Sequence, residues 1–257
     1  YPLTTQISIK GYNVQNLSLQ PSTPIYDLPK TIVLSMVLLA VFFASQLIGV
    51  VLFAPWVLQD TANLDIAEKV LQGSENGTLM SLSLGFTLAM VLGCVYLFIR
   101  FKNSRVKDYL AIKPFTWYQL LQCSALLIVL NVIINLVTVW LGREPMMFMD
   151  NLAASAHPRW LLVLAMVVFA PIYEEVIFRG FMWTGLASSK LGMWGASVLT
   201  SIVFAVIHMQ YGVVELLGIF CLAMLFSYGR IISGSLLLPV VLHMMNNGLA
   251  MGQYLYG

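Results

Sequence analysis

Long apolar runs alternate with short polar connections from residue 31 to the end of the chain. A helix needs about 20 mostly apolar residues to cross the hydrocarbon core of a bilayer. Seven segments have this character, at residues 31–58, 78–99, 117–141, 160–187, 191–209, 212–229 and 234–254. The pattern therefore predicts an all-α polytopic membrane protein with about seven transmembrane helices.

The polar and apolar pattern divides the chain into three regions. Residues 1–29 form a polar tail without the charged-then-apolar order of a signal peptide, either native or a cloning remnant. Residues 30–150 hold the N-terminal transmembrane helices. Residues 151–257 hold a helix bundle in which the chemically interesting side chains gather, so we expect the catalytic helices in this C-terminal half.

Composition agrees with a membrane protein. Apolar residues make up 60% of the chain and charged residues only 9%, whereas soluble domains average roughly 45–50% and 25%. A soluble fold of this length needs more charge to cover its surface. The net charge of +2 and the lack of a dense basic stretch argue against a nucleic-acid partner. The lipid bilayer is the expected environment.

Basic residues in the connections predict how the chain is oriented. The segment 100–116 holds five of them, and cytoplasmic connections are enriched in Lys and Arg. The same end of the bundle would carry Lys10, Lys30, Arg179, Lys190 and Arg230. We therefore expect a cytoplasmic N-terminus.

The first three spans carry only neutral polar side chains in their interiors. These include Gln46, Gln122, Asn131 and Asn135. Asn131 and Asn135 lie four residues apart and therefore on one helix face. Hydrogen bonds between helices are the expected role of such residues in a membrane.

Costly polar groups concentrate in three later spans. Ionisable side chains inside a membrane are expensive and by default indicate function. They are Glu174, Glu175 and Arg179 in the fourth span, His208 in the fifth, and His243 with the neutral Asn246 and Asn247 in the seventh.

Spacing predicts that these groups converge. A hairpin turning at residues 188–192 brings Glu174 and His208 to the same depth, because residue 191 is their midpoint. His243 and Asn247 are one helical turn apart on one face of the last span. Asn246 diverges from Asn247 by about 100°, so we expect it to tolerate alanine.

The two neighbouring glutamates cannot point the same way. Glu175 and Arg179 are four residues apart and can pair along one helix face, which neutralises both charges. Glu174 is then the free carboxylate. Pro171 removes a backbone hydrogen bond one turn earlier, and a kink is expected there.

Three motifs in this order resemble the CPBP family, the CAAX proteases and bacteriocin-processing enzymes also called Abi. This family includes the Ras-converting CAAX endopeptidase of eukaryotes. The resemblance covers roughly residues 155–250. The motifs are Glu174-Glu175-x-x-x-Arg179, Phe204-x-x-x-His208 and His243-x-x-x-Asn247.

The resemblance implies an intramembrane endopeptidase of the glutamic type, acting on a membrane-associated protein or peptide without a cofactor. Glu174 and His208 would activate water, and His243 and Asn247 would form the oxyanion hole. Glu175, Arg179 and Phe204 would support the site. Seven spans, one fewer than in eukaryotic relatives, suggest a protein of a prokaryotic inner membrane.

Other functions stay open at this point. Two histidines and a glutamate also suit a catalytic zinc ion, although no HExxH helix is present. Intramembrane carboxylates also serve proton-coupled transporters, but no inverted repeat is visible. A non-catalytic immunity or scaffold protein is the third alternative. The sequence does not decide between prenylated peptides, bacteriocin leaders and other membrane-anchored substrates.

Overall fold

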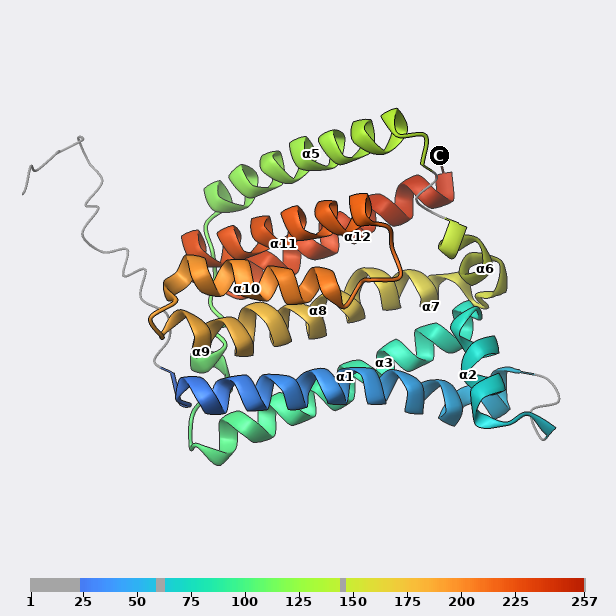
Figure 1. The fold of residues 1–257 in the computed structure, drawn as a ribbon, viewed down its shortest axis with the longest axis horizontal. Coiled ribbons are helices and arrows are strands. Elements are labelled where there is room, and N and C mark those ends of the chain that lie inside the picture. Colours follow the sequence, from blue (N-terminus) through green and yellow to red (C-terminus); the bar gives the residue numbers. More distant parts are fainter. Residues whose placement is uncertain (1–23, 59–62, 144–146, 257) are drawn as a thin grey trace, which may run out of the picture.

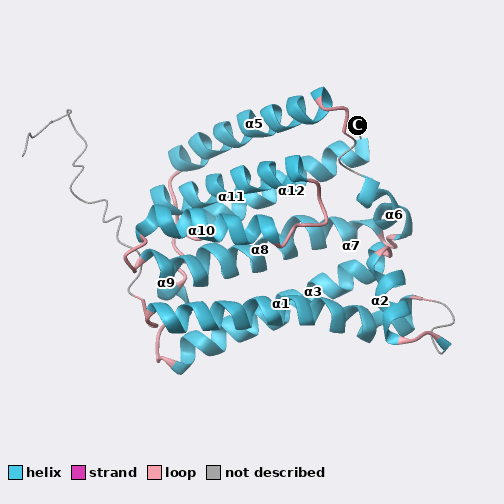
Figure 2. Cartoon of the chain, in the orientation of Figure 1, coloured by secondary structure: helices cyan, strands magenta, loops and turns pink. Residues whose placement is uncertain are grey.

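The computed structural model describes residues 24–58, 63–143 and 147–256, and every regular element within them is a helix (Figure 2). The all-α prediction is therefore confirmed for this part of the chain. Most of the predicted polar tail, residues 1–23, lies outside the described residues, and so does Lys10.

Within the described residues, five helices are long and apolar enough to cross a membrane. They correspond to the first four predicted spans and to the sixth. They are α1 (Leu28–Val57), α3 (Gly77–Phe101), α5 (Trp117–Trp140), the continuous helix Arg159–Ala187 and α11 (Val213–Ser233).

The other two predicted spans form helices that do not meet these criteria. α10 (Gly192–Val206) has 15 residues, so at about 1.5 Å per residue it is about 22 Å long and shorter than a bilayer core. α12 (Leu237–Tyr256) has 20 residues, but His243, Asn246 and Asn247 make it more polar. Length and composition thus support five crossings, two fewer than the sequence pattern predicts.

Local signals in the sequence set the helix ends. Asp27, Asn76 and Thr116 cap α1, α3 and α5 by accepting backbone N–H bonds in the first turn. α11 ends at Gly234, whose φ of 61° is left-handed and suits glycine. Short helices lie in the connections: α2 (Ile66–Ser74), α4 (Val106–Tyr109) and α6 (Met147–Ser155).

The helices are arranged so that Arg159–Ala187 lies in the middle of the bundle (Figure 1). α1 and α3 pack along each other on one side of it, and α10, α11 and α12 lie on the other. α5 lies at the outer edge, where it contacts α11 and α12. The helix that carries Glu174 and Glu175 is therefore covered from both sides.

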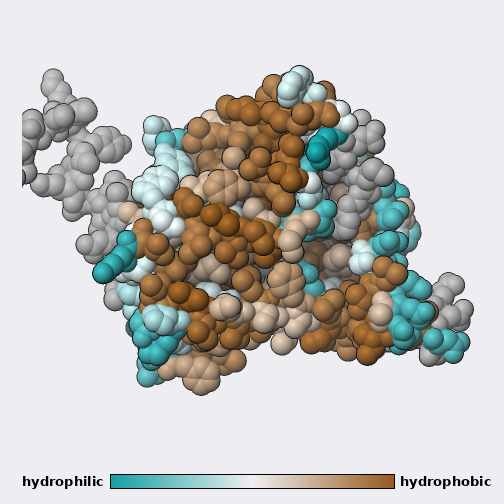
Figure 3. Space-filling model, in the orientation of Figure 1, coloured by the Kyte–Doolittle hydropathy of each residue, from teal (hydrophilic) through white to brown (hydrophobic). Residues whose placement is uncertain are grey.

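The outer surface is apolar over the central part of the helices. Figure 3 shows this apolar zone between hydrophilic patches at the two ends of the bundle. Large apolar side chains of the long helices are exposed, including Met36 on α1 and Leu136 on α5. Such a contiguous exposed apolar surface is typical of contact with lipid, and the protein is an integral membrane protein.

Neutral polar side chains join the helices, as the sequence predicts. The side chain of Gln46 on α1 hydrogen-bonds Tyr173 on the central helix. Gln122 on α5 donates to the hydroxyl of Tyr228 on α11 over 3.1 Å. Both bonds join helices through neutral polar side chains.

Candidate functional site

The central helix changes its winding on both sides of the two glutamates. It runs as α7 (Arg159–Leu164), a π-helical segment η3 (Ala165–Phe169), α8 (Ala170–Glu175), a second π-helical segment η4 (Val176–Met182) and α9 (Trp183–Ala187). π-helical turns are rare in proteins, and those that occur often lie at functional sites. The sequence predicted only a kink at Pro171.

The first π-helical segment leaves a backbone carbonyl without its helical donor. The N–H of Ala170 bonds the carbonyl of Ala165, five residues back. In that register the carbonyl of Met166 would receive the N–H of residue 171, but Pro171 has none. Nδ2 of Asn247, on α12, donates to the Met166 carbonyl over 3.0 Å instead.

A side chain of α11 bonds a backbone carbonyl at the second π-helical segment. Trp183 donates its N–H to Phe178, five residues back, so it does not bond the carbonyl of Arg179. Nε of Arg230 donates to that carbonyl over 3.2 Å. Side chains from α11 and α12 thus satisfy one carbonyl at each π-helical segment and hold α8 between them.

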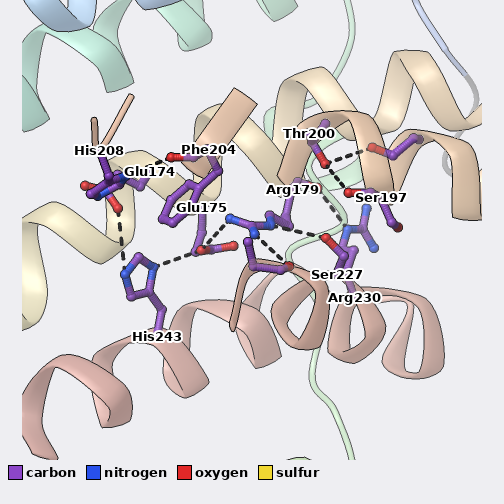
Figure 4. A network of polar contacts seen from close by, with 12 residues as sticks. Glu174, Glu175, Arg179, Ser197, Thr200, Phe204, His208, Ser227, Arg230 and His243 are labelled. Carbon is purple, nitrogen blue, oxygen red and sulfur yellow. Dashed lines mark hydrogen bonds and ion pairs between the residues drawn. The ribbon is translucent and has the colours of Figure 1, made fainter. Parts of the chain in front are cut away.

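Glu175 is the buried centre of the polar network (Figure 4). Its Oε1 accepts from Nη1 of Arg179 at 3.0 Å and lies 2.9 Å from Nδ1 of His243. Glu175 and Arg179 are both 0% exposed. The predicted pair is confirmed, and it extends to a histidine from another helix.

Arg179 is bonded on every side. Its Nη2 donates to the carbonyl of Ala223 at 2.8 Å, and its Nε to the hydroxyl of Ser227 at 3.4 Å. The guanidinium carbon lies 4.8 Å from the ring centroid of Phe204 and 5.6 Å from that of Phe226. Such partners offset the desolvation of a buried cation.

Glu174 faces two imidazoles. Its Oε2 lies 3.7 Å from Nε2 of His243, which therefore bridges Glu174 and Glu175. Glu174 also interacts electrostatically with His208, which Figure 4 shows beside it. The α9–α10 hairpin turns between Ala187 and Gly192, as predicted, and so carries His208 back to the depth of Glu174.

Phe204 fixes the orientation of His208. Nδ1 of His208 lies 2.7 Å from the carbonyl of Phe204. A carbonyl only accepts, so Nδ1 carries a proton, and in the neutral ring Nε2 then keeps a lone pair. The Phe204 ring packs against the ring of His208 at 4.8 Å and edge-on to that of His243 at 5.8 Å.

Tyr211 is a neighbour of the site that sequence reasoning missed. It lies in the turn between α10 and α11, and its ring stacks on His208 at 6.5 Å and 22°. Burial, together with the negative charge of Glu174, raises the pKa of its phenol. No motif marks it; only its position three residues after His208 could have suggested proximity.

Two expectations from the sequence are corrected. Arg230 does not lie beyond the end of the sixth helix, as the span 212–229 implied, because α11 continues to Ser233 and Arg230 is only 2% exposed. Asn246 does not point away from Asn247, since its Nδ2 donates to Oδ1 of Asn247 over 3.3 Å. Side-chain torsions bring these two amides together although their Cα–Cβ bonds diverge.

Residues 156–249, which hold all of these groups except those of the early helices, match the family described as type II CAAX prenyl endopeptidase Rce1-like. We call this stretch, which resembles the CAAX proteases, the CAAX-protease segment. The assignment agrees with the resemblance carried by the three motifs, and it points to a protease.

The chain also matches curated proteins. An uncharacterized 24.3 kDa protein of Escherichia coli is 39% identical over 108 residues, which are 40% of this chain and 49% of that protein. The UPF0177 protein YbdI of Lactococcus lactis is 36% identical over 59 residues, 23% of this chain and 30% of the relative. The chain thus spans half the length of these relatives or less. No solved structure matches.

Glu175→Gln tests the buried network of the CAAX-protease segment. The change removes a negative charge that faces Arg179 and His243, and breaking such a buried pair costs about 3–5 kcal/mol. We expect a marked fall in thermal stability, measured by unfolding of the purified protein in detergent.

The matched control is Glu215→Gln. Glu215 lies 3.5 Å from Nη1 of Arg143, and the two side chains are 15% and 45% exposed, so solvent screens this pair more than the fully buried pair of Glu175. An equal loss of thermal stability in both variants would show that the buried Glu175 pair stabilises the fold no more than the Glu215 pair does.

Proposed function

We propose that the protein is an intramembrane endopeptidase that hydrolyses a peptide bond of a membrane-associated protein or peptide. The observation that carries this proposal is the buried carboxylate of Glu174, set between His243 and His208 within the CAAX-protease segment. Peptide hydrolysis needs a base for water, donors for an oxyanion and an acid for the leaving amine. Each of these has a candidate in the cluster.

Glu174 is the proposed base. A water that donates one O–H to Glu174 can donate the other to Nε2 of His208, because the Phe204 carbonyl holds the proton on Nδ1. Two acceptors then orient the attacking lone pair. After attack, the protonated Glu174 returns its proton to the leaving amine.

His243 and Asn247 are the proposed oxyanion donors. Glu175 engages Nδ1 of His243, so Nε2 can donate only when the ring carries both protons. The resulting imidazolium, with Arg179, balances the charges of the two glutamates. The amide of Asn247 has two N–H bonds, and the Met166 carbonyl takes one, so the second is available for the oxyanion.

We propose that this chemistry uses no metal. Both ring nitrogens of His243 lie near carboxylate oxygens, and Nδ1 of His208 is bonded to a carbonyl. Within the described ranges, no three His, Cys, Asp or Glu side chains are grouped so that they could hold a metal ion.

We further propose a prokaryotic inner membrane, with the start of α1 on the cytoplasmic side. The basic connection between α3 and α5, with Lys102, Arg105 and Lys107, lies at that end of the bundle (Figure 1). Basic connections favour the cytoplasmic face.

The general test compares membranes of cells that express the active protein with membranes of cells that express Glu174→Ala. Precursors that accumulate only in the variant identify substrates. Identical membrane proteomes would argue against the endopeptidase and favour the transporter.

Glu174→Gln isolates the base. The amide has nearly the same shape but cannot take a proton, so we expect at least about 100-fold slower turnover with unchanged thermal stability. The rate is measured with an internally quenched, farnesylated CAAX peptide in detergent. Glu215→Gln is the matched control and should keep the native rate; near-native cleavage by Glu174→Gln would refute the assignment.

Asn247→Ala tests the oxyanion hole. One such donor contributes about 2.7–4 kcal/mol in the transition state, so the rate should fall about 100–1,000-fold. Substrate affinity should change little, because the donor acts mainly in the transition state. Single-turnover cleavage separates the rate of the chemical step from the substrate affinity. A fall in rate explained wholly by weaker substrate binding would rule out the oxyanion role of Asn247.

Chelation tests the metal-free mechanism against zinc. Prolonged treatment with 1,10-phenanthroline should leave the rate of peptide cleavage unchanged, because no proposed step needs a metal. Inactivation that added zinc reverses would replace the glutamate mechanism with a metalloprotease.

A further inference from the structure

Three asparagine amides form a directed chain that ends at the central helix. Nδ2 of Asn131 on α5 donates to Oδ1 of Asn246 at 3.1 Å. Nδ2 of Asn246 donates to Oδ1 of Asn247 at 3.3 Å. Nδ2 of Asn247 then donates to the carbonyl of Met166 at 3.0 Å. Each amide accepts from the one before it or donates to the one after it.

Backbone carbonyls at both ends fix the direction of the chain. Met166 O can only accept, so Asn247 must turn its amino group toward it and its oxygen toward Asn246. At the other end, Nδ2 of Asn131 also donates to the carbonyl of Leu127 at 3.0 Å. Reversing any amide would therefore place two donors or two acceptors against each other.

The chain controls the group that the proposed mechanism uses. With the bond to Met166 alone, the Asn247 amide can still change its tilt within the limits of its side-chain torsions. A second bond at the opposite end, from Asn246, fixes the plane of the amide and the direction of its remaining N–H. Positioned donors stabilise an oxyanion far better than mobile ones, because they need no reorganisation during the reaction.

We propose that Asn131 and Asn246 are positioning residues that orient the Asn247 amide for the oxyanion. The inference rests on the proposed endopeptidase function. It also gives α5 a part in the site, although α5 lies outside residues 156–249 and at the outer edge of the bundle (Figure 1). The site is thus completed by a helix that the family match does not include.

The experiment measures turnover and KM with the farnesylated, internally quenched CAAX peptide. Asn246→Ala should lower kcat about 10- to 100-fold, the usual effect of removing a residue that orients a reacting group. KM should change little. Asn131→Ala, one amide further away, should lower kcat less. In the Asn247→Ala background, both substitutions should have no further effect on kcat, because the group they orient is absent.

Two controls separate positioning from helix packing. Asn135→Ala removes an exposed asparagine one turn along α5. Ser124→Ala removes another contact between α5 and α12, from the hydroxyl to the sulfur of Met245 at 3.7 Å. Both should keep the native kcat. Losses equal to that of Asn246→Ala, or losses that add to that of Asn247→Ala, would overturn the inference.

A measurement without substrate keeps this inference separate from the proposed function. Thermal unfolding of Asn131→Ala, Asn246→Ala and the double variant should be non-additive, because the two residues share a hydrogen bond. If the native protein cleaves no peptide but this coupling appears, the proposed function fails and the amide chain stands. If the native protein cleaves and the two effects on stability add, the amide chain fails alone.

Discussion

A charged group inside this bundle is tolerated only when another charged or strongly polar group meets it, and Glu175 is where this constraint is concentrated. One of its two carboxylate oxygens, Oε1, faces both Arg179 from the same helix and His243 from α12. In a medium of low dielectric, removing either partner leaves an uncompensated charge. The positions of α12 relative to the central helix, and of His243 relative to Glu174, follow from this requirement.

Backbone groups obey the same constraint. At each of the two π-helical segments that flank α8, a side chain from another helix donates to a backbone carbonyl: Asn247 to that of Met166 and Arg230 to that of Arg179. In the hydrocarbon region of a membrane, no water is present to donate a hydrogen bond to such a carbonyl. Residues that look catalytic in the sequence therefore also hold the helix that presents the carboxylates, and stability and chemistry are coupled in the same side chains.

The sequence predicts the helices and most of the site because both depend on local regularities. Apolar runs define the spans, and the spacing of Glu175 and Arg179 defines their pair. Features that depend on side-chain torsions or on a changed helical register were not predictable in this way. Asn246 meets Asn247 through torsions, and Arg230 is buried because α11 ends later than its apolar pattern suggests. The structure has fewer candidate spans than the sequence predicts, because α10 is too short and α12 is too polar to meet the length and hydropathy criteria.

Pro171 has a consequence for the order of assembly. Synthesis proceeds from the N-terminus, so the helix containing Pro171 enters the membrane before α12 does. Until α12 docks, the Met166 carbonyl lacks the Asn247 donor and Glu174 lacks the imidazole of His243. The nascent protein therefore holds its carboxylates in an unfinished bundle without the groups that would make them reactive. Docking of α12 completes the helix and the proposed catalytic cluster in one event.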